Sequence, residues 1–142
     1  MGDPRDDAPL PADAPPHPVD VLAAVGGLEG MRAVLRDLYT RLFADPMVGF
    51  FFQGRDLERL VEHQLRFTAR ALGADIAYTG RPLPEAHAGL PPILPGHFDR
   101  RHTLLAQVLR AHAVPDDARE AWLAYDRAFR RAVLGARGAG RP

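Results

Sequence analysis

Apolar and polar residues follow a helical period in four segments of the chain. Over residues 28–43, apolar side chains recur every three or four positions, which places them on one face of a helix. Similar stripes run through residues 57–72, 97–112 and 116–134, and four long helices with short connections predict an all-α domain. The expected core positions are Leu28, Met31, Leu35, Leu38, Leu42, Leu57, Leu60, Val61, Phe67, Thr68, Ala71, Phe98, Leu105, Val108, Leu109, His112, Trp122, Leu123, Phe129 and Val133.

Helix boundaries are marked by residues with known terminal preferences. Pro46 stops the first helix, because proline lacks the amide donor that a helix interior requires. Asp56 is a good N-cap for the second helix, and Gly73 can end it. Pro115 and Asp116 separate the third helix from the fourth.

Two polar side chains occupy positions on the stripes that ought to be apolar. Tyr39 lies on the inner stripe of the first helix and Gln64 on that of the second. Buried polar groups need hydrogen-bond partners. Either Tyr39 points its hydroxyl outward and Gln64 bonds a backbone carbonyl, or both side chains face a shared pocket and bind something polar there.

The stretch "YTGRPLPEAHAGLPPILPGHF", residues 78–98, contains five prolines and three glycines, too many for a helix of ordinary length. His87 stands alone in its middle. A loop histidine is commonly just solvated, but these breakers would hold a very short helix in place and so present one ligand atom. A protein-only metal site from His63, His87, His97 and His102 lacks any recognised ligand spacing, so we expect single surface residues.

Composition narrows the class of protein. A chain of 142 residues suggests one domain, and zero formal net charge gives no electrostatic reason to expect nucleic acid or a membrane as a partner. There is no cysteine, no apolar run near the ~18 residues of a membrane span and no signal-peptide pattern, so we expect a cytoplasmic protein. Residues 1–18 hold six prolines and four aspartates and are predicted to be disordered, which leaves a domain over 19–134 and a flexible tail over 135–142.

Several of these motifs together resemble the truncated haemoglobins, most closely group I, over residues 20–134. They are Gly26-Gly27 before the first long helix, "LYTRLFADP", the phenylalanines before the second helix, Gln64 with Phe67, and the spacing from "YTG" to a histidine. The resemblance implies a globin-like, two-over-two helical sandwich that holds one haem b per chain.

The resemblance also implies roles for single residues. His87 matches the proximal iron ligand, whose helix in this family is reduced to about one turn within a loop, so the chain breakers around it are expected. Tyr39 and Gln64 match the distal polar pair, which would donate hydrogen bonds to bound O₂. The haem contacts implied besides His87 are Phe52, Leu60, Phe67, Phe98 and Arg101, and Leu60 stands where larger globins often place histidine.

Three positions depart from the family pattern. Gly73-Ala74 replaces a second Gly-Gly, and Thr68 replaces a phenylalanine that often gates a ligand tunnel. Arg101 falls on the pocket side, where relatives carry an apolar residue or tryptophan. An inward arginine is costly unless it is paired, so we expect Arg101 to extend to the haem propionates or to water. The alternative is that Arg101 reaches the bound ligand.

The expected function is therefore the binding of O₂ and other diatomic ligands, NO and CO among them. The leading mechanism is NO dioxygenation, in which an unidentified reductase restores ferrous iron. The alternatives are reversible O₂ storage or transport, ligand sensing, and a haem-free helical interaction module.

Overall fold

The computed structural model describes residues 20–72 and 93–138, and it is helical throughout. In chain order the helices are α1 (Val21–Ala24), α2 (Gly27–Ala44), the 3₁₀ helix η2 (Gly49–Phe52), α3 (Leu57–Ala71), α5 (Pro95–Ala111), α6 (Asp116–Ala128) and α7 (Arg130–Gly138). No strand occurs within the described ranges, so the all-α prediction is confirmed. Residues 1–18, Gly73, Ala74 and His87 lie outside the described residues.

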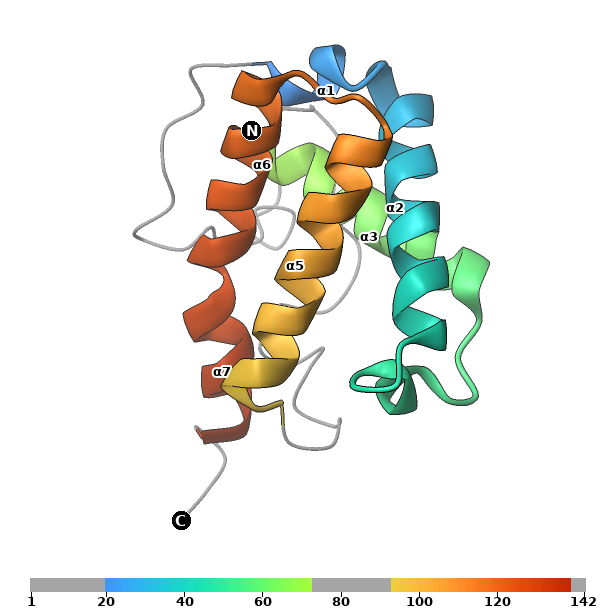
Figure 1. Ribbon diagram of the computed structural model, residues 1–142, viewed down its shortest axis with the longest axis vertical. Coiled ribbons are helices and arrows are strands. Elements are labelled where there is room, and N and C mark those ends of the chain that lie inside the picture. Colours follow the sequence, from blue (N-terminus) through green and yellow to red (C-terminus); the bar gives the residue numbers. More distant parts are fainter. Residues whose placement is uncertain (1–19, 73–92, 139–142) are drawn as a thin grey trace, which may run out of the picture.

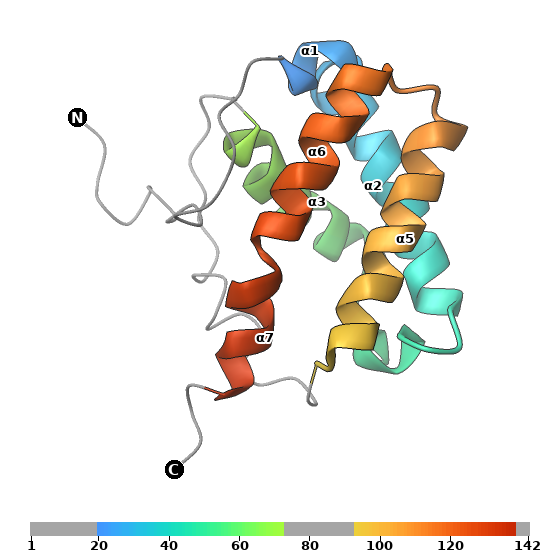
Figure 2. The same ribbon diagram turned by 60° about the vertical axis from the view of Figure 1, so that its left-hand side comes forward.

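The long helices form two pairs, α2 with α3 and α5 with α6, and α2 also packs against α5 (Figure 1). The short helix α1 contacts α2 and α6 at one end of the molecule, which Figure 2 shows from a second side. The core between the pairs is built from aliphatic side chains that are almost fully buried: Met31, Val34, Leu35, Leu38, Leu42, Val61, Leu65, Leu105, Val108 and Leu109.

The predicted helix boundaries hold at the first two helices. Helix α2 ends at Ala44, just before Pro46, and the Asp56 carboxylate accepts a hydrogen bond from the Arg59 amide at 3.2 Å, as an N-cap does. The α2 start requires glycine, because Gly26 adopts a positive φ of 96°.

The predicted fourth helix is interrupted. The Phe129 amide donates to the carbonyl of Asp126, three residues back, at 3.2 Å, and this tighter turn separates α6 from α7. Helix α7 then continues to Gly138, so regular structure extends into the segment that was expected to be a flexible tail.

Two expected core positions are wrong. Leu28 is 39% exposed at the start of α2. His112 is exposed at the end of α5, where its Nε2 lies 3.0 Å from an oxygen of Asp37. Both residues lie in the terminal turn of a helix. Such a turn extends beyond the neighbouring helix that buries the central turns.

Asp45 anchors the turn that carries the phenylalanines. Its buried carboxylate accepts hydrogen bonds from the Met47 amide at 2.8 Å and the Val48 amide at 3.3 Å. The other carboxylate oxygen pairs with the Arg100 guanidinium on α5 at 2.7 Å, and this hydrogen bond holds the pKa of Asp45 below its usual range. The end of α2 and the start of η2 are thereby fixed against α5.

Candidate functional site

The two polar side chains on the inner stripes meet. The Tyr39 hydroxyl on α2 donates to Oε1 of Gln64 on α3 across 3.3 Å, and Tyr39 is only 7% exposed. The amide nitrogen of Gln64 in turn donates to the Thr68 hydroxyl, one helical turn further along α3, at 2.8 Å. The Tyr39 hydroxyl is thus directed to Gln64 and not outward, and the Gln64 amide bonds side chains and not a backbone carbonyl.

An aromatic and aliphatic wall adjoins this pair. The ring of Phe52 meets Tyr39 edge-on with centroids 5.8 Å apart, and it stacks on Phe43 at 5.0 Å. The α3 side chains that pack against the core but are only half-buried are Leu57, Leu60 and Phe67, whereas those on the adjoining face, Val61, Leu65 and Thr68, are buried. Phe98 near the start of α5 is buried as well. One side of α3 thus presents apolar groups that the described residues cover only in part.

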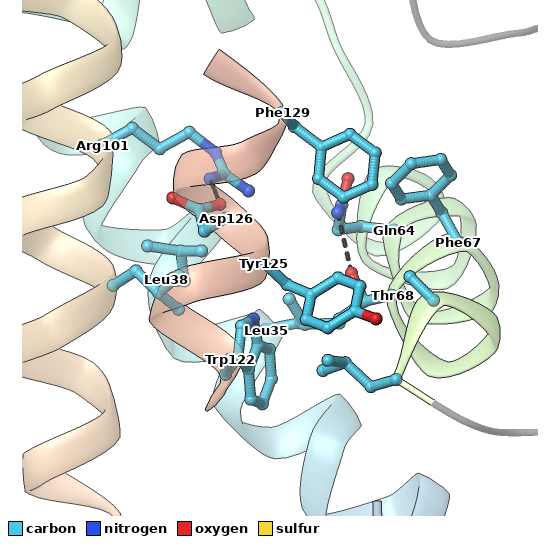
Figure 3. Close-up of a pocket in the computed structure, with 13 residues that line it drawn as sticks. Leu35, Leu38, Gln64, Phe67, Thr68, Arg101, Trp122, Tyr125, Asp126 and Phe129 are labelled. Atoms are coloured by element: carbon cyan, nitrogen blue, oxygen red, sulfur yellow. Dashed lines mark hydrogen bonds and ion pairs between the residues drawn. The ribbon is translucent and has the colours of Figure 1, made fainter. Parts of the chain in front are cut away.

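A small cavity lies on the Thr68 side of Gln64, between α3, α5 and α6 (Figure 3). Its volume is about 30 Å³, which is enough for a water molecule or a similarly small ligand. Apolar residues make up about half of its lining, and the other lining residues carry polar groups: Gln64, Thr68, Arg101, Trp122, Tyr125 and Asp126.

Arg101 lines this cavity, and within the described residues its partner is a carboxylate. Its Nη1 donates to Oδ1 of Asp126 on α6 at 2.5 Å, and Figure 3 shows the guanidinium lying over that carboxylate. The second oxygen of Asp126 lies 2.7 Å from Nδ1 of His102. Arg101 is thus paired with a carboxylate of the protein itself. A buried arginine needs a charge partner, and Asp126 provides one without the haem propionates or water that we expected.

Burial and ion pairing determine the protonation states of three groups at the site, Tyr39, Arg101 and Asp126. Burial raises the pKa of the Tyr39 hydroxyl, although the nearby Arg101 guanidinium opposes that shift, so Tyr39 remains a neutral donor. Burial works against the charge on Arg101, but the attraction of Asp126 outweighs it and the pKa of Arg101 is raised. The same pairing lowers the pKa of Asp126 despite its burial.

The histidines within the described ranges have separate surroundings. His63 is exposed on α3, His97 accepts a hydrogen bond from the Leu94 amide at 3.0 Å, and His102 pairs with Asp126. The described residues contain no group of three histidine or acidic side chains that could hold a metal ion.

Two functional features escaped the sequence analysis. Asp126 was not singled out, although a charged residue among apolar positions of the last helix is a signal of the same kind as Tyr39 and Gln64. Thr68 was interpreted as the loss of a phenylalanine, and its spacing of four residues from Gln64, which puts both side chains on one face of a helix, was the missed signal.

A haem is a flat apolar ring with a polar metal centre, and the described residues fit such a group on one side. The half-buried wall of Phe52, Leu57, Leu60 and Phe67 offers the apolar contact, and Tyr39 with Gln64 offers hydrogen-bonding groups beside it. The small cavity is far too small for a haem. It matches the size of a gaseous ligand instead.

Helices that pair in this way around an apolar wall and a buried polar pair define a globin-like haem protein. The family model of the bacterial-like globins matches residues 20–134. Group 1 truncated hemoglobin GlbN of Mycolicibacterium paratuberculosis is 35% identical over 101 residues, which cover 71% of this chain and 74% of that protein. Group 1 truncated hemoglobin of Tetrahymena pyriformis is 30% identical over 99 residues, covering 70% and 81%.

Solved structures agree with this comparison. The truncated hemoglobin of Tetrahymena pyriformis, in its Fe(III) form, superposes with a TM-score of 0.74 at 27% identity, covering 80% of this chain and 97% of that one. The hemoglobin of Chloroflexus aurantiacus gives a TM-score of 0.71 at 29% identity, and the match covers 82% of this chain and 98% of that one.

This chain belongs to the bacterial-like globin family, among the group I truncated haemoglobins with their two-over-two helical fold. As a globin it binds haem and diatomic gases. None of the described helices has the length and apolar character needed to cross a membrane.

The bond between Gln64 and Thr68 can be tested with Thr68→Val, which keeps the shape of the side chain and removes the hydroxyl. We expect the free energy of unfolding to fall by about 1 kcal/mol, because the Gln64 amide loses its acceptor. Thr40→Val is the matched control, since the exposed Thr40 hydroxyl bonds only the Arg36 carbonyl of its own helix at 2.7 Å. Urea unfolding of both variants measures the difference, and equal losses would contradict a specific role for Thr68.

Proposed function

We propose that this globin holds one haem b per chain, with His87 as the axial ligand, and that it supports NO dioxygenation. The observation that carries the proposal is the hydrogen-bonded pair of Tyr39 and Gln64 beside a half-buried apolar wall. The bound haem supplies the iron to which the gas binds and which changes oxidation state. All other contributions come from side chains of this protein.

His87 is proposed as the axial ligand on grounds of sequence. It stands between two clusters of chain breakers and matches the proximal histidine of the truncated haemoglobins. The histidines in the described ranges support the choice indirectly. His63 is exposed, His97 bonds a backbone amide, and His102 and His112 each lie beside a carboxylate.

Tyr39 and Gln64 would hold a gas that carries partial negative charge. A tyrosine hydroxyl has one proton, and in this structure it is directed to Gln64. To stabilise a ligand, Tyr39 must turn that proton away from Gln64. The Gln64 amide has two N–H groups, of which Thr68 takes one, so the second remains for the ligand. The bond to Thr68 thereby sets the orientation of the Gln64 amide, whose oxygen faces Tyr39 and whose nitrogen faces Thr68.

The proposed reaction joins NO with O₂ and one electron to give nitrate. The electron comes from a separate reductase, which we expect in the same cytoplasmic compartment. The protein contributes donors that retain O₂ until NO arrives and, beside Gln64, a cavity of about 30 Å³ with room for a small gas molecule. Reversible O₂ storage or transport, or ligand sensing, would use the same donors without turnover. NO consumption in the presence of a reductase separates these functions.

The proximal assignment is tested by His87→Ala. We expect the variant to lose haem, or to retain it only when free imidazole replaces the missing ring. The measurement is the ferrous optical spectrum with and without imidazole, and His63→Ala is the control because His63 is exposed on α3. An unchanged ferrous spectrum of His87→Ala would show that another residue holds the iron.

The distal pair is tested by the rate of O₂ release. Tyr39→Phe removes one hydroxyl and keeps the ring against Phe52, so O₂ should dissociate roughly tenfold faster or more, the effect of one hydrogen bond to a charged group. Gln64→Leu should act in the same direction, and the double variant should fall short of the product, because the two side chains bond each other.

Stopped-flow measurements give these rates, and CO release serves as the control because bound CO carries less charge than bound O₂. If neither single variant changes O₂ release while Arg101→Leu changes it strongly, the assignment of Tyr39 and Gln64 is wrong.

A further inference from the structure

Residues of α3 form three parallel stripes along its surface. Residues four and seven positions apart share one side of a helix, and consecutive residues lie about 100° apart around its axis. A stripe of basic residues therefore lies between a stripe of glutamates and the side that faces the candidate site. In this order the stripes are Glu58 and Glu62, then Arg59, His63 and Arg66, then Leu60, Gln64 and Phe67.

The glutamates of the first stripe already have partners on α2. Glu58 pairs with Arg36 at 2.8 Å, and Glu62 pairs with Arg32 at 2.7 Å. The hydrogen bond from Arg32 also holds the pKa of Glu62 below its usual range. The carboxylates of α3 are thus directed to α2 and form no ion pair with the basic stripe beside them.

The basic stripe is open to solvent. Arg59, His63 and Arg66 are all exposed, and neither arginine forms an ion pair within the described part of the chain. The two arginines are seven residues apart, which places them about 10 Å apart along the helix. Two guanidinium groups at this spacing can meet two carboxylates on one partner surface, and each can bind a carboxylate through two N–H groups.

The position of the stripe indicates which kind of partner would use it. The stripe borders Leu60 and Phe67, which belong to the half-buried apolar wall. That wall is the proposed contact for the haem, so a protein that docks on the stripe comes close to the edge of the bound haem. Electron transfer slows steeply with distance, and such closeness therefore suits an electron donor.

We propose that Arg59, His63 and Arg66 form the docking surface for the electron donor of this globin, and that the donor presents an acidic surface to them. This inference rests on the proposed function, which requires one electron from a reductase for each nitrate formed. Opposite charges orient the donor and speed its association, by roughly ten- to thousandfold at low ionic strength.

The test uses reduced flavodoxin, a small acidic flavoprotein, as the donor and the ferric haem protein as the acceptor. Under carbon monoxide, the absorption band of the ferrous CO complex gives the second-order rate constant of reduction. For the unmodified protein we expect this constant to fall about tenfold between about 10 and 200 mM salt, because salt screens the charges. Arg59→Gln/Arg66→Gln should be reduced roughly tenfold more slowly at low salt and should lose most of the salt dependence.

Two control variants separate the effect of the stripe from that of net charge. Arg110→Gln/Arg127→Gln removes the same charge from exposed positions on α5 and α6, and it should keep both the rate and its salt dependence. Arg59→Lys/Arg66→Lys preserves the charge and should keep them too. Free photoreduced riboflavin, which needs no docking surface, should reduce all variants equally fast.

Docking is also measured without electron transfer. Oxidised flavodoxin is added at low salt to the ferrous CO complex of the globin, and amide NMR signals report where it binds. We expect the signals of α3 around Arg59 and Arg66 to shift and those of α6 to stay unchanged.

The proposal is overturned if the two double glutamine variants lose rate equally, if neither loses rate, or if the α3 signals do not shift. It is also overturned if Arg59→Gln/Arg66→Gln loses haem, since the stripe would then serve the haem, or if the stripe binds phosphatidylglycerol vesicles and not flavodoxin. NO consumption with riboflavin as the reductant tests the proposed function separately. Its absence, together with the expected flavodoxin results, would reject NO dioxygenation alone.

Discussion

The hydrogen bond between Tyr39 and Gln64 is the interaction on which the site depends. It joins α2 to α3 where both helices present polar groups on an otherwise apolar face, and an unpaired polar group at such a position would be costly. The bond continues to Thr68, whose hydroxyl accepts a hydrogen bond from the Gln64 amide, and the charge of Arg101 acts on the Tyr39 hydroxyl by opposing the rise of its pKa. Hydrogen bonds in such a series strengthen one another in a medium of low dielectric.

This series explains how α5 becomes part of a site built mainly on α2 and α3. The charge of Arg101 on α5 acts on the Tyr39 hydroxyl, and Asp126 binds the same guanidinium to α6. A change at Asp126 therefore acts on Tyr39 chiefly through Arg101, whereas a change at Thr68 acts through Gln64. Substitutions at Asp126 and at Thr68 therefore enter the series from opposite ends, and the bond between Tyr39 and Gln64 couples them.

Much of the fold followed from residue spacing. The central turns of α2 and α5 were predictable because leucine and valine recur there with the helical period, and Asp56 marked the start of α3 by a local preference. Leu28 and His112 were mispredicted since they continue a periodic stripe past the end of the packed partner, and periodicity does not indicate where that partner ends. The turn at Phe129 carries no glycine or proline, so a pattern of chain breakers could not find it.

The site was predictable where a polar residue interrupts an apolar stripe, as Tyr39 and Gln64 do. The partner of Arg101 was not, because Asp126 is 25 residues away on another helix and pairing across helices is determined by packing.

The most direct test of the account is the C–O stretching frequency of the ferrous protein with CO bound, measured by infrared spectroscopy. Donors and positive charge beside the ligand oxygen weaken the C–O bond and lower this frequency. The account predicts a low frequency in the unmodified protein, set by the Tyr39 hydroxyl and its neighbours. A frequency typical of an apolar pocket would contradict it, and the absence of any haem–CO complex would leave a helical module without haem.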